Sequence, residues 1–338
     1  MPTRLVCRGA RASAVRGGLI AAALTLTAWV PVVAQERGTV ESDWLQSQLL
    51  GARKHYRVYL PPSYETSRER RFPVAYYLHG VQGNETDWIE RGRLAAVMDS
   101  LIAAGMPEMI VVMPDGDDGF YTSWVRPPQW RLCPLRTDLR EPATEFCVRH
   151  PRYDQYVAQE LVRHIDATFR TLADARHRGI AGLSMGGFGA LALATQFPRA
   201  FSAAASHSGA VAALALAVDT AAGTVTWAAT ADTLRAKWPT LFPLLSDVFG
   251  ADTADWWRRD PLGHVRRIDA EGRRGLPALY ADVGTEDGLL LNNRALRIEL
   301  GRLSVPLEYH EYAGAHDWAY WRAHVGESLT WLARHIAQ

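Results

Sequence analysis

The feature that most constrains this chain is the stretch RGIAGLSMGGFGALALA, residues 178–194. A short apolar run leads into a Gly-x-Ser-x-Gly pattern around Ser184, and a segment rich in alanine and leucine follows. This order predicts a strand, a sharp turn with a hydroxyl at its tip, and then a helix. A residue on so tight a turn has a strained backbone, so its neighbours Gly182 and Gly186 must lack bulk. The helix then directs its N-terminal N–H groups toward Ser184.

Strand and helix patterns alternate along most of the chain. Strand-like runs cover residues 54–60, 72–79, 109–113, 201–206, 277–283 and 306–312, and helical spacing covers residues 91–104, 153–169, 290–303 and 320–336. Successive βα units predict an α/β fold with a mostly parallel central sheet and helices on both faces. Residues 35–52 are expected to form a tether or an edge element.

Residues 211–260 depart from this alternation. The segment carries four of the twelve tryptophans, with prolines and glycines that interrupt the pattern. We expect a Trp-rich insertion over the cleft of an enzyme, or else a satellite core packed on the main domain.

The N-terminus has the pattern of an export signal. Four arginines precede an apolar run from Gly17 to about Val33, and Val32 and Ala34 suit a signal-peptidase site before Gln35. We therefore expect a signal peptide at residues 1–34, a single domain at residues 35–338, and a secreted or periplasmic protein without stable membrane insertion after cleavage. The alternative is an uncleaved membrane anchor, although the apolar run is short for a spanning helix.

Cysteine content and net charge indicate which covalent links and which ligands to expect. Cys133 and Cys147 would remain after export, where a disulfide between them is favoured over two free thiols. No Cys/His spacing suggests zinc. A formal net charge of +1 does not indicate a protein that binds nucleic acid.

An acidic loop, PDGDDG, follows the run at residues 109–113. It resembles a calcium loop in composition only, because Arg126 stands where the closing glutamate of an EF-hand would fall. We interpret it as a loop at a strand end that borders a cleft, and expect no metal site.

A serine nucleophile needs a base to accept its proton and an acid to orient that base. On a sheet of this kind the chain order is Ser, acid, His, each at or beyond the C-terminal end of a strand. Ser184, Asp287 and His316 satisfy both order and placement, and this chemistry requires no metal or organic cofactor.

Each of these residues has competitors. Asp282 lies inside a strand, where a structural role is expected, and Glu286 is adjacent to Asp287 but would project differently. His79 and His207 also lie at strand ends, and we expect His79 to brace its loop.

The negative charge that develops on the substrate oxygen requires two backbone donors. One is expected to be the Met185 N–H, just after the nucleophile. The other is expected to be the Val81 N–H, in the loop after the strand at residues 72–79.

Five motifs in combination, LHGVQGNETDW, VMPDG, GLSMGGFGA, GTED and GAHDWAYW, resemble the esterase family of α/β-hydrolases. That family includes S-formylglutathione hydrolases (esterase D), feruloyl esterases and the antigen 85 mycolyltransferases. The resemblance covers most of residues 50–335 and implies the α/β-hydrolase fold and the roles assigned above. The signal peptide and the segment holding both cysteines do not fit a cytosolic formylglutathione enzyme, and residues 211–260 match no subfamily.

Three functions compete. The first is a serine carboxylic-ester hydrolase that acts through an acyl-enzyme on a small-molecule or carbohydrate-linked ester. The second is an acyltransferase of the mycolyltransferase type that uses the same residues, and the third is a non-catalytic binding module on the same scaffold. The residues that bind the substrate, the acyl and alcohol specificity and the oligomeric state are left open by the sequence.

Overall fold

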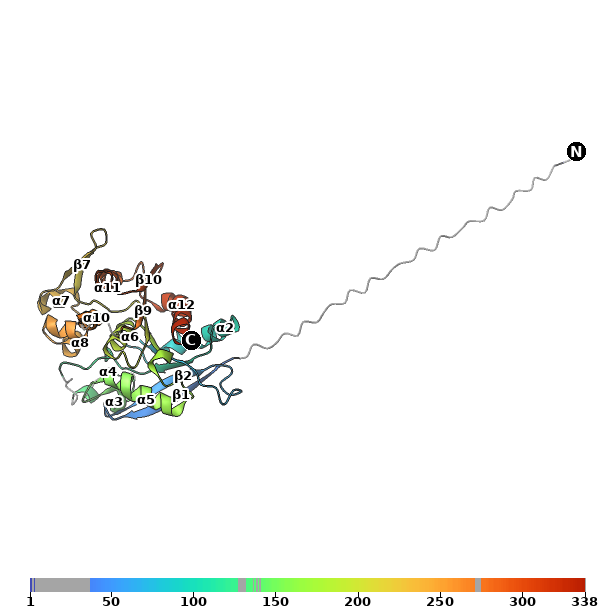
Figure 1. Cartoon of the computed structure of the whole chain (residues 1–338), viewed down its shortest axis with the longest axis horizontal. Coiled ribbons are helices and arrows are strands. Elements are labelled where there is room, and N and C mark those ends of the chain that lie inside the picture. Colours follow the sequence, from blue (N-terminus) through green and yellow to red (C-terminus); the bar gives the residue numbers. More distant parts are fainter. Residues whose placement is uncertain are drawn as a thin grey trace. The chain divides into compact units, whose positions relative to one another are not determined.

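Eight strands form one sheet in this computed structural model, in the order β1-β2-β4-β3-β5-β6-β9-β10 (Figure 1). β1 and β2 run antiparallel to each other, and β2 runs antiparallel to β4. All the remaining neighbours are parallel. The mostly parallel sheet predicted from the βα repetition is therefore confirmed. Its strands are β1 Thr39–Ser47, β2 Ala52–Leu60, β3 Val74–Leu78, β4 Ile110–Pro114, β5 Arg178–Leu183, β6 Ala203–His207, β9 Ala278–Gly284 and β10 Glu308–Tyr312.

The structure describes residues 1, 3, 37–126, 132–135, 137, 139, 141–270 and 275–337. The chain divides into two units, Met1–Gln35 and Glu36–Gln338. Apart from residues 1 and 3, the predicted signal peptide and its cleavage site lie outside the described residues. Within the described part of the chain, no helix has the length and apolar character needed to cross a membrane.

Helices separate most of the parallel strands. The longer ones are α2 Leu94–Ala103, α6 Met185–Gln196, α8 Phe242–Phe249, α10 Pro261–Ala270, α11 Leu290–Arg302 and α12 Trp318–Ile336. Shorter turns of helix are α1 Asp87–Glu90, η1 Cys133–Leu135, α3 Ala143–Phe146, α4 Tyr153–Gln155, η2 Tyr156–Leu161, α5 Val162–Thr168, η3 Ala175–His177, α7 Ala231–Lys237 and α9 Thr253–Arg259.

The sheet is buried on both faces, because its central strands alternate between two cores. Val74, Tyr76 and Leu78 of β3 join the core that includes side chains of α6 and α11. Ala75 and Tyr77 of the same strand join the second core, which includes side chains of α2 and α12. Helices on both faces explain why every residue of β3, β4 and β5 is buried, and why these strands show no alternation of apolar and polar residues.

Two segments show what the patterns could not decide. Residues 35–52, expected to be a tether or an edge element, contain β1, which lies at one edge of the sheet with its first six residues exposed. The helix predicted over residues 153–169 is present, but its middle turn, η2, is a π-helix between α4 and α5. The apolar spacing of the segment is the same for an α-turn as for a π-turn, so the sequence pattern gives no sign of the wider turn.

The insertion at residues 211–260 begins with a separate two-stranded sheet of β7 Ala215–Asp219 and β8 Thr224–Trp227, followed by α7, α8 and α9. Trp256 of α9 is buried and its ring stacks on Phe249, with 4.9 Å between centroids. Trp227 and Trp257 pair with each other at 4.8 Å. Most of its tryptophans thus serve packing within the insertion.

Candidate active site

Ser184 occupies the tip of the turn between β5 and α6. Its backbone has φ 52° and ψ −115°, a conformation that residues other than glycine rarely adopt. The turn is tight enough that a Cβ on Gly182 would lie 2.4 Å from the Gly186 backbone, and one on Gly186 would lie 2.4 Å from the Leu78 carbonyl oxygen. The two glycines of the motif are therefore required by the close approach of β3, β5 and α6.

Backbone hydrogen bonds hold this strained turn. The Ser184 N–H donates to the His207 carbonyl at 2.9 Å, and the Ser184 carbonyl accepts from the N–H groups of Phe188 and Ala210 at 3.0 Å each. The side chain stays partly exposed, whereas its neighbours on both sides are buried. The hydroxyl is thus fixed in position and accessible.

The structure brings Ser184, His316 and Asp287 together from three separate segments. Nε2 of His316 lies 2.9 Å from Oγ of Ser184. Nδ1 of His316 lies 2.8 Å from Oδ2 and 3.0 Å from Oδ1 of Asp287. A carboxylate only accepts, so the proton of the neutral ring belongs on Nδ1 and Nε2 is left to accept from the serine hydroxyl.

The Asp287 carboxylate is inaccessible, whereas the His316 side chain is one-third exposed. Burial opposes ionisation of Asp287, but the hydrogen bond and charge interaction with His316, aided by the Leu289 N–H at 2.7 Å, lower the pKa of the carboxyl below its ordinary value. A charged, oriented acceptor therefore stands behind the imidazole.

The competing residues of the sequence have other partners. Asp282 Oδ2 lies 2.7 Å from His207 Nδ1, and its Oδ1 accepts from the Tyr320 hydroxyl at 2.8 Å. His207 Nε2 lies 2.7 Å from Oγ of Ser328 on α12. This second Ser-His-Asp set is fully buried, so it joins β6, β9 and α12 rather than facing a substrate.

The other competitors also lie outside the Ser184–His316–Asp287 chain. Glu286 is exposed. Asp317, the residue that follows His316 in the chain, caps the N-terminus of α12 by accepting from the Tyr320 N–H at 3.0 Å. His79 braces its own loop, as expected: the Gly116 N–H donates to its Nε2 at 2.9 Å, which leaves the proton on Nδ1 for the Gly80 carbonyl at 2.8 Å.

Two backbone N–H groups near Ser184 are available to a ligand. Val81 and Met185 both line the cavity above the serine. Among the described residues, neither N–H has an assigned acceptor. Met185 is the first residue of α6, where the backbone N–H has no partner within the helix.

The cavity that contains Ser184 and His316 has a volume of about 730 Å³. One wall is apolar and is built largely by the insertion, through Trp238, Leu241, Leu245 and Phe249. The insertion therefore covers the cleft, as predicted, but mainly with the aliphatic and phenyl side chains of α8 and the residue before it. Only one of its tryptophans lines the cavity. These wall residues were missed in the sequence because their spacing also suits packing within the insertion.

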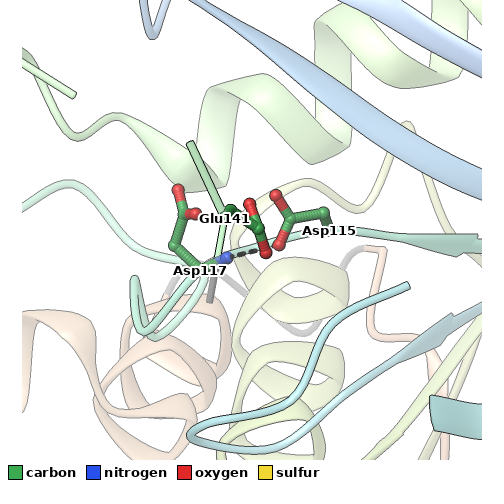
Figure 2. A group of neighbouring side chains, drawn as sticks. All are labelled: Asp115, Asp117 and Glu141. Carbon is green, nitrogen blue, oxygen red and sulfur yellow. Dashed lines mark hydrogen bonds between the residues drawn. The ribbon is translucent and has the colours of Figure 1, made fainter. Parts of the chain in front are cut away.

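The acidic loop after β4 lies beside this site. Asp115, Asp117 and Glu141 bring carboxylate oxygens within 4.8 Å of one another (Figure 2). Lys54 was not singled out in the sequence, yet its buried Nζ lies 2.8 Å from Asp115 and 2.6 Å from Asp117. Burial, together with the charge of Asp115, raises the pKa of Asp117 to about 7. Because Lys54 contacts both Asp115 and Asp117, its ammonium supplies a positive charge between two of the three carboxylates.

Cys133 and Cys147 form a disulfide, as predicted. It lies next to a second cavity of about 390 Å³, which Asp118 also lines.

Comparison with known proteins assigns the family. Residues 47–332 match the family model described as "Putative esterase". The chain belongs to this family. An esterase of Mycobacterium tuberculosis is 30% identical over 286 residues, which cover 80% of this chain and 54% of that protein. The chain thus spans about half the length of this curated relative.

Two further comparisons bear on the fold and the esterase assignment. An endo-1,4-beta-xylanase/feruloyl esterase of Xylanibacter ruminicola is 30% identical over 169 residues, 48% of this chain and 20% of that protein. The solved structure of a ferulic acid esterase matches with a TM-score of 0.64 and 25% identity, over 89% of this chain and 99% of that one. The α/β-hydrolase fold implied by the motif resemblance is confirmed.

Proposed function

We propose that this esterase-family protein is a serine carboxylic-ester hydrolase, with Ser184 as nucleophile, His316 as base and Asp287 as the acid that orients the base. The observation that carries the proposal is the continuous chain of hydrogen bonds from Asp287 through His316 to Ser184, opening into the 730 Å³ cavity. The names of the relatives agree with this activity.

The reaction would proceed through an acyl-enzyme. The Ser184 oxygen attacks the ester carbonyl while its proton passes to Nε2 of His316. The resulting imidazolium, stabilised by Asp287, returns that proton to the departing alcohol as the tetrahedral intermediate collapses. Water, activated by the same nitrogen, then attacks the acyl-enzyme and releases the carboxylic acid.

The developing oxyanion would be bound by the N–H groups of Val81 and Met185. The lack of an assigned acceptor for either group, and their place in the cavity wall, support this role. Each such donor contributes about 3–4 kcal/mol of transition-state stabilisation. We call residues Gly80–Gly83, which carry the Val81 donor, the oxyanion loop.

The substrate class follows from the relatives and the cavity. Two relatives are named for feruloyl or ferulic acid ester cleavage, which supports a small-molecule or carbohydrate-linked ester as substrate. The apolar wall from the insertion suits the hydrocarbon part of such an ester. Export to a secreted or periplasmic location is also proposed, supported by the disulfide, which is typical of oxidising compartments.

The test is turnover of short-chain aryl esters by the wild type and by Ser184→Ala. The variant should keep the wild-type melting temperature and lose turnover by a factor on the order of 10⁴ or more. Retained turnover would refute the proposal. Product analysis with an added acceptor alcohol distinguishes hydrolysis from acyl transfer: the free acid should remain the main product, whereas a dominant new ester would favour the acyltransferase.

A further inference from the structure

The oxyanion loop contains a residue that does not favour its own conformation. Gln82 has φ 61°, in the left-handed region, which is strained for a residue that has a Cβ. Within the loop, the Gly83 N–H donates to the Gly80 carbonyl at 3.0 Å. Since that single internal bond must compete with the strain, contacts from outside the loop are needed to hold the neighbouring Val81 N–H in place.

Asp118 makes one such outside contact, on the peptide group that follows Val81. The Gln82 N–H donates to Oδ1 of Asp118 at 2.7 Å, a charge-assisted hydrogen bond. This bond restrains the peptide plane between Val81 and Gln82, and hence the ψ angle at Val81. The Val81 N–H itself belongs to the preceding peptide unit, whose Gly80 carbonyl lies 2.8 Å from His79 Nδ1. Asp118 does not line the cavity that contains Ser184, so it is not placed to touch a substrate there.

The loop that carries Asp118 is itself firmly held. Lys54 joins Asp115 to Asp117, as described above, and the Tyr153 hydroxyl donates to the second oxygen of Asp117 at 2.6 Å. The Asp117 N–H also donates to Asp115 Oδ1 at 3.0 Å, the bond drawn in Figure 2. Asp118 thus follows directly on a buried, cross-linked turn, which makes it a rigid point of attachment.

A second tie joins the same two loops. The Gly116 N–H donates to His79, which in turn donates to the Gly80 carbonyl, and the Tyr121 hydroxyl donates to the His79 carbonyl at 3.2 Å. The start of the oxyanion loop is therefore fixed through His79, and its far side through Asp118.

We propose that Asp118 is a positioning residue that holds the Val81 N–H in the geometry needed to bind the oxyanion, by accepting the hydrogen bond of Gln82. This role rests on the proposed function. In this role, Asp118 of the acidic motif after β4 would assist the reaction although it does not contact the substrate.

Three substitutions separate the effect of the hydrogen-bond acceptor of Asp118 from the effects of its charge and of its side-chain shape. Asp118→Asn keeps an oxygen acceptor of the same shape and loses the charge. Asp118→Leu keeps the approximate shape and loses the acceptor, and Asp118→Ala loses both. The matched control is Asp174→Ala. Asp174 also accepts a backbone N–H, that of Arg176 at 2.9 Å, but it is the N-cap of η3, just before the N-terminal end of β5, whereas Ser184 follows the C-terminal end of that strand.

The measurements are kcat and KM for p-nitrophenyl acetate and the inhibition constant of phenylboronic acid, which forms a tetrahedral adduct with a serine oxygen. We expect Asp118→Ala and Asp118→Leu to lower kcat by about 10- to 100-fold, because a misplaced donor contributes little to binding the oxyanion. KM should change by less than about threefold, and boronate affinity should fall in parallel with kcat. Asp118→Asn and Asp174→Ala should stay within about threefold of the wild type in kcat.

The outcomes distinguish this inference from the proposed function. Wild-type turnover that does not depend on Ser184 would refute the proposed function itself. Ser184-dependent turnover that Asp118→Leu leaves unchanged would refute only the role of Asp118, as would an Asp118→Asn variant as impaired as Asp118→Leu. If Asp118→Ala does not fold, the comparison of the leucine and asparagine variants decides alone.

Discussion

Three side chains carry the proposed chemistry, and each is held by a different kind of contact. Ser184 is fixed by backbone hydrogen bonds at a strained turn, His316 by its two neighbours in the triad, and Asp287 by burial and the Leu289 N–H. All three could be named from their order and their places after strands. The sequence separates Asp287 from Glu286 only weakly, because the local backbone path decides which of two adjacent carboxylates turns inward.

The first prediction concerns Asp287. In Asp287→Asn the amide group can donate to Nδ1 of His316, which favours the wrong tautomer, so kcat should fall by about 10⁴-fold with the fold intact. Steady-state kinetics with an aryl ester would measure this. Glu286→Gln, at the exposed neighbouring position, is the control and should retain wild-type kcat. A triad role for Asp287 is excluded if both variants behave alike.

At the scale of elements, the site depends on how closely β3, β5 and α6 approach one another. The sequence predicted this unit well, because glycine spacing and strand-helix order are local signals. It predicted that the insertion covers the cleft, but not which of its side chains line the cavity. Trp238, Leu245 and Phe249 come from an insertion whose path over Ser184 is set by tertiary packing, and no local pattern distinguishes an apolar wall from an apolar core. The π-turn at Tyr156–Leu161 could not be predicted either, because its apolar spacing does not differ from that of an α-helix.

The second prediction concerns Gly186. A Cβ at this position would lie 2.4 Å from the Leu78 carbonyl oxygen and 2.6 Å from that of His79, both backbone atoms that cannot rotate away. Gly186→Ala should therefore lower the free energy of unfolding by about 2–3 kcal/mol and displace the start of the oxyanion loop, with loss of activity. Urea denaturation and ester turnover would measure both effects.

The control for Gly186 is Gly301, a glycine of α11 with open space where a Cβ would stand. Gly301→Ala should be neutral or raise the free energy of unfolding by up to about 1 kcal/mol, through helix propensity. Equal effects of the two substitutions would show that the close approach at Gly186 is not what requires glycine there.

At the scale of the whole molecule, two cores enclose the sheet, and buried polar groups within and around them must find partners. The sequence indicated the fold class and the two layers of helices, because βα repetition dictates both. It could not indicate that His207, Asp282 and Ser328 meet in the interior, or that Lys54 pairs with two carboxylates of the acidic loop. Those pairings join residues far apart in the chain, and only the folded topology brings them together.

The third prediction concerns the pH dependence of global stability. Asp260 is buried, and burial raises the pKa of its carboxyl from 3.8 to about 6, opposed in part by the hydrogen bond from the Leu262 N–H. Between these two pH values the folded protein holds a proton that the unfolded chain releases, so this group contributes less stability as pH rises. The full loss is on the order of 2–3 kcal/mol.

Asp260→Asn removes this titration while keeping an acceptor for Leu262. The difference in unfolding free energy, variant minus wild type, should therefore increase between pH 4 and pH 7. Urea denaturation at both pH values would measure it. A difference that stays constant, or that decreases with pH, would contradict the assignment.

The activation of Ser184 by His316 is tested most directly by covalent labelling. A fluorophosphonate probe reacts only with an activated serine oxygen, and peptide mass spectrometry locates the adduct. We predict that the wild type gains one adduct, on Ser184, and that His316→Ala, with an unchanged melting temperature, is labelled at least about 10³-fold more slowly. An adduct elsewhere, or equal labelling rates in the two proteins, would contradict the account.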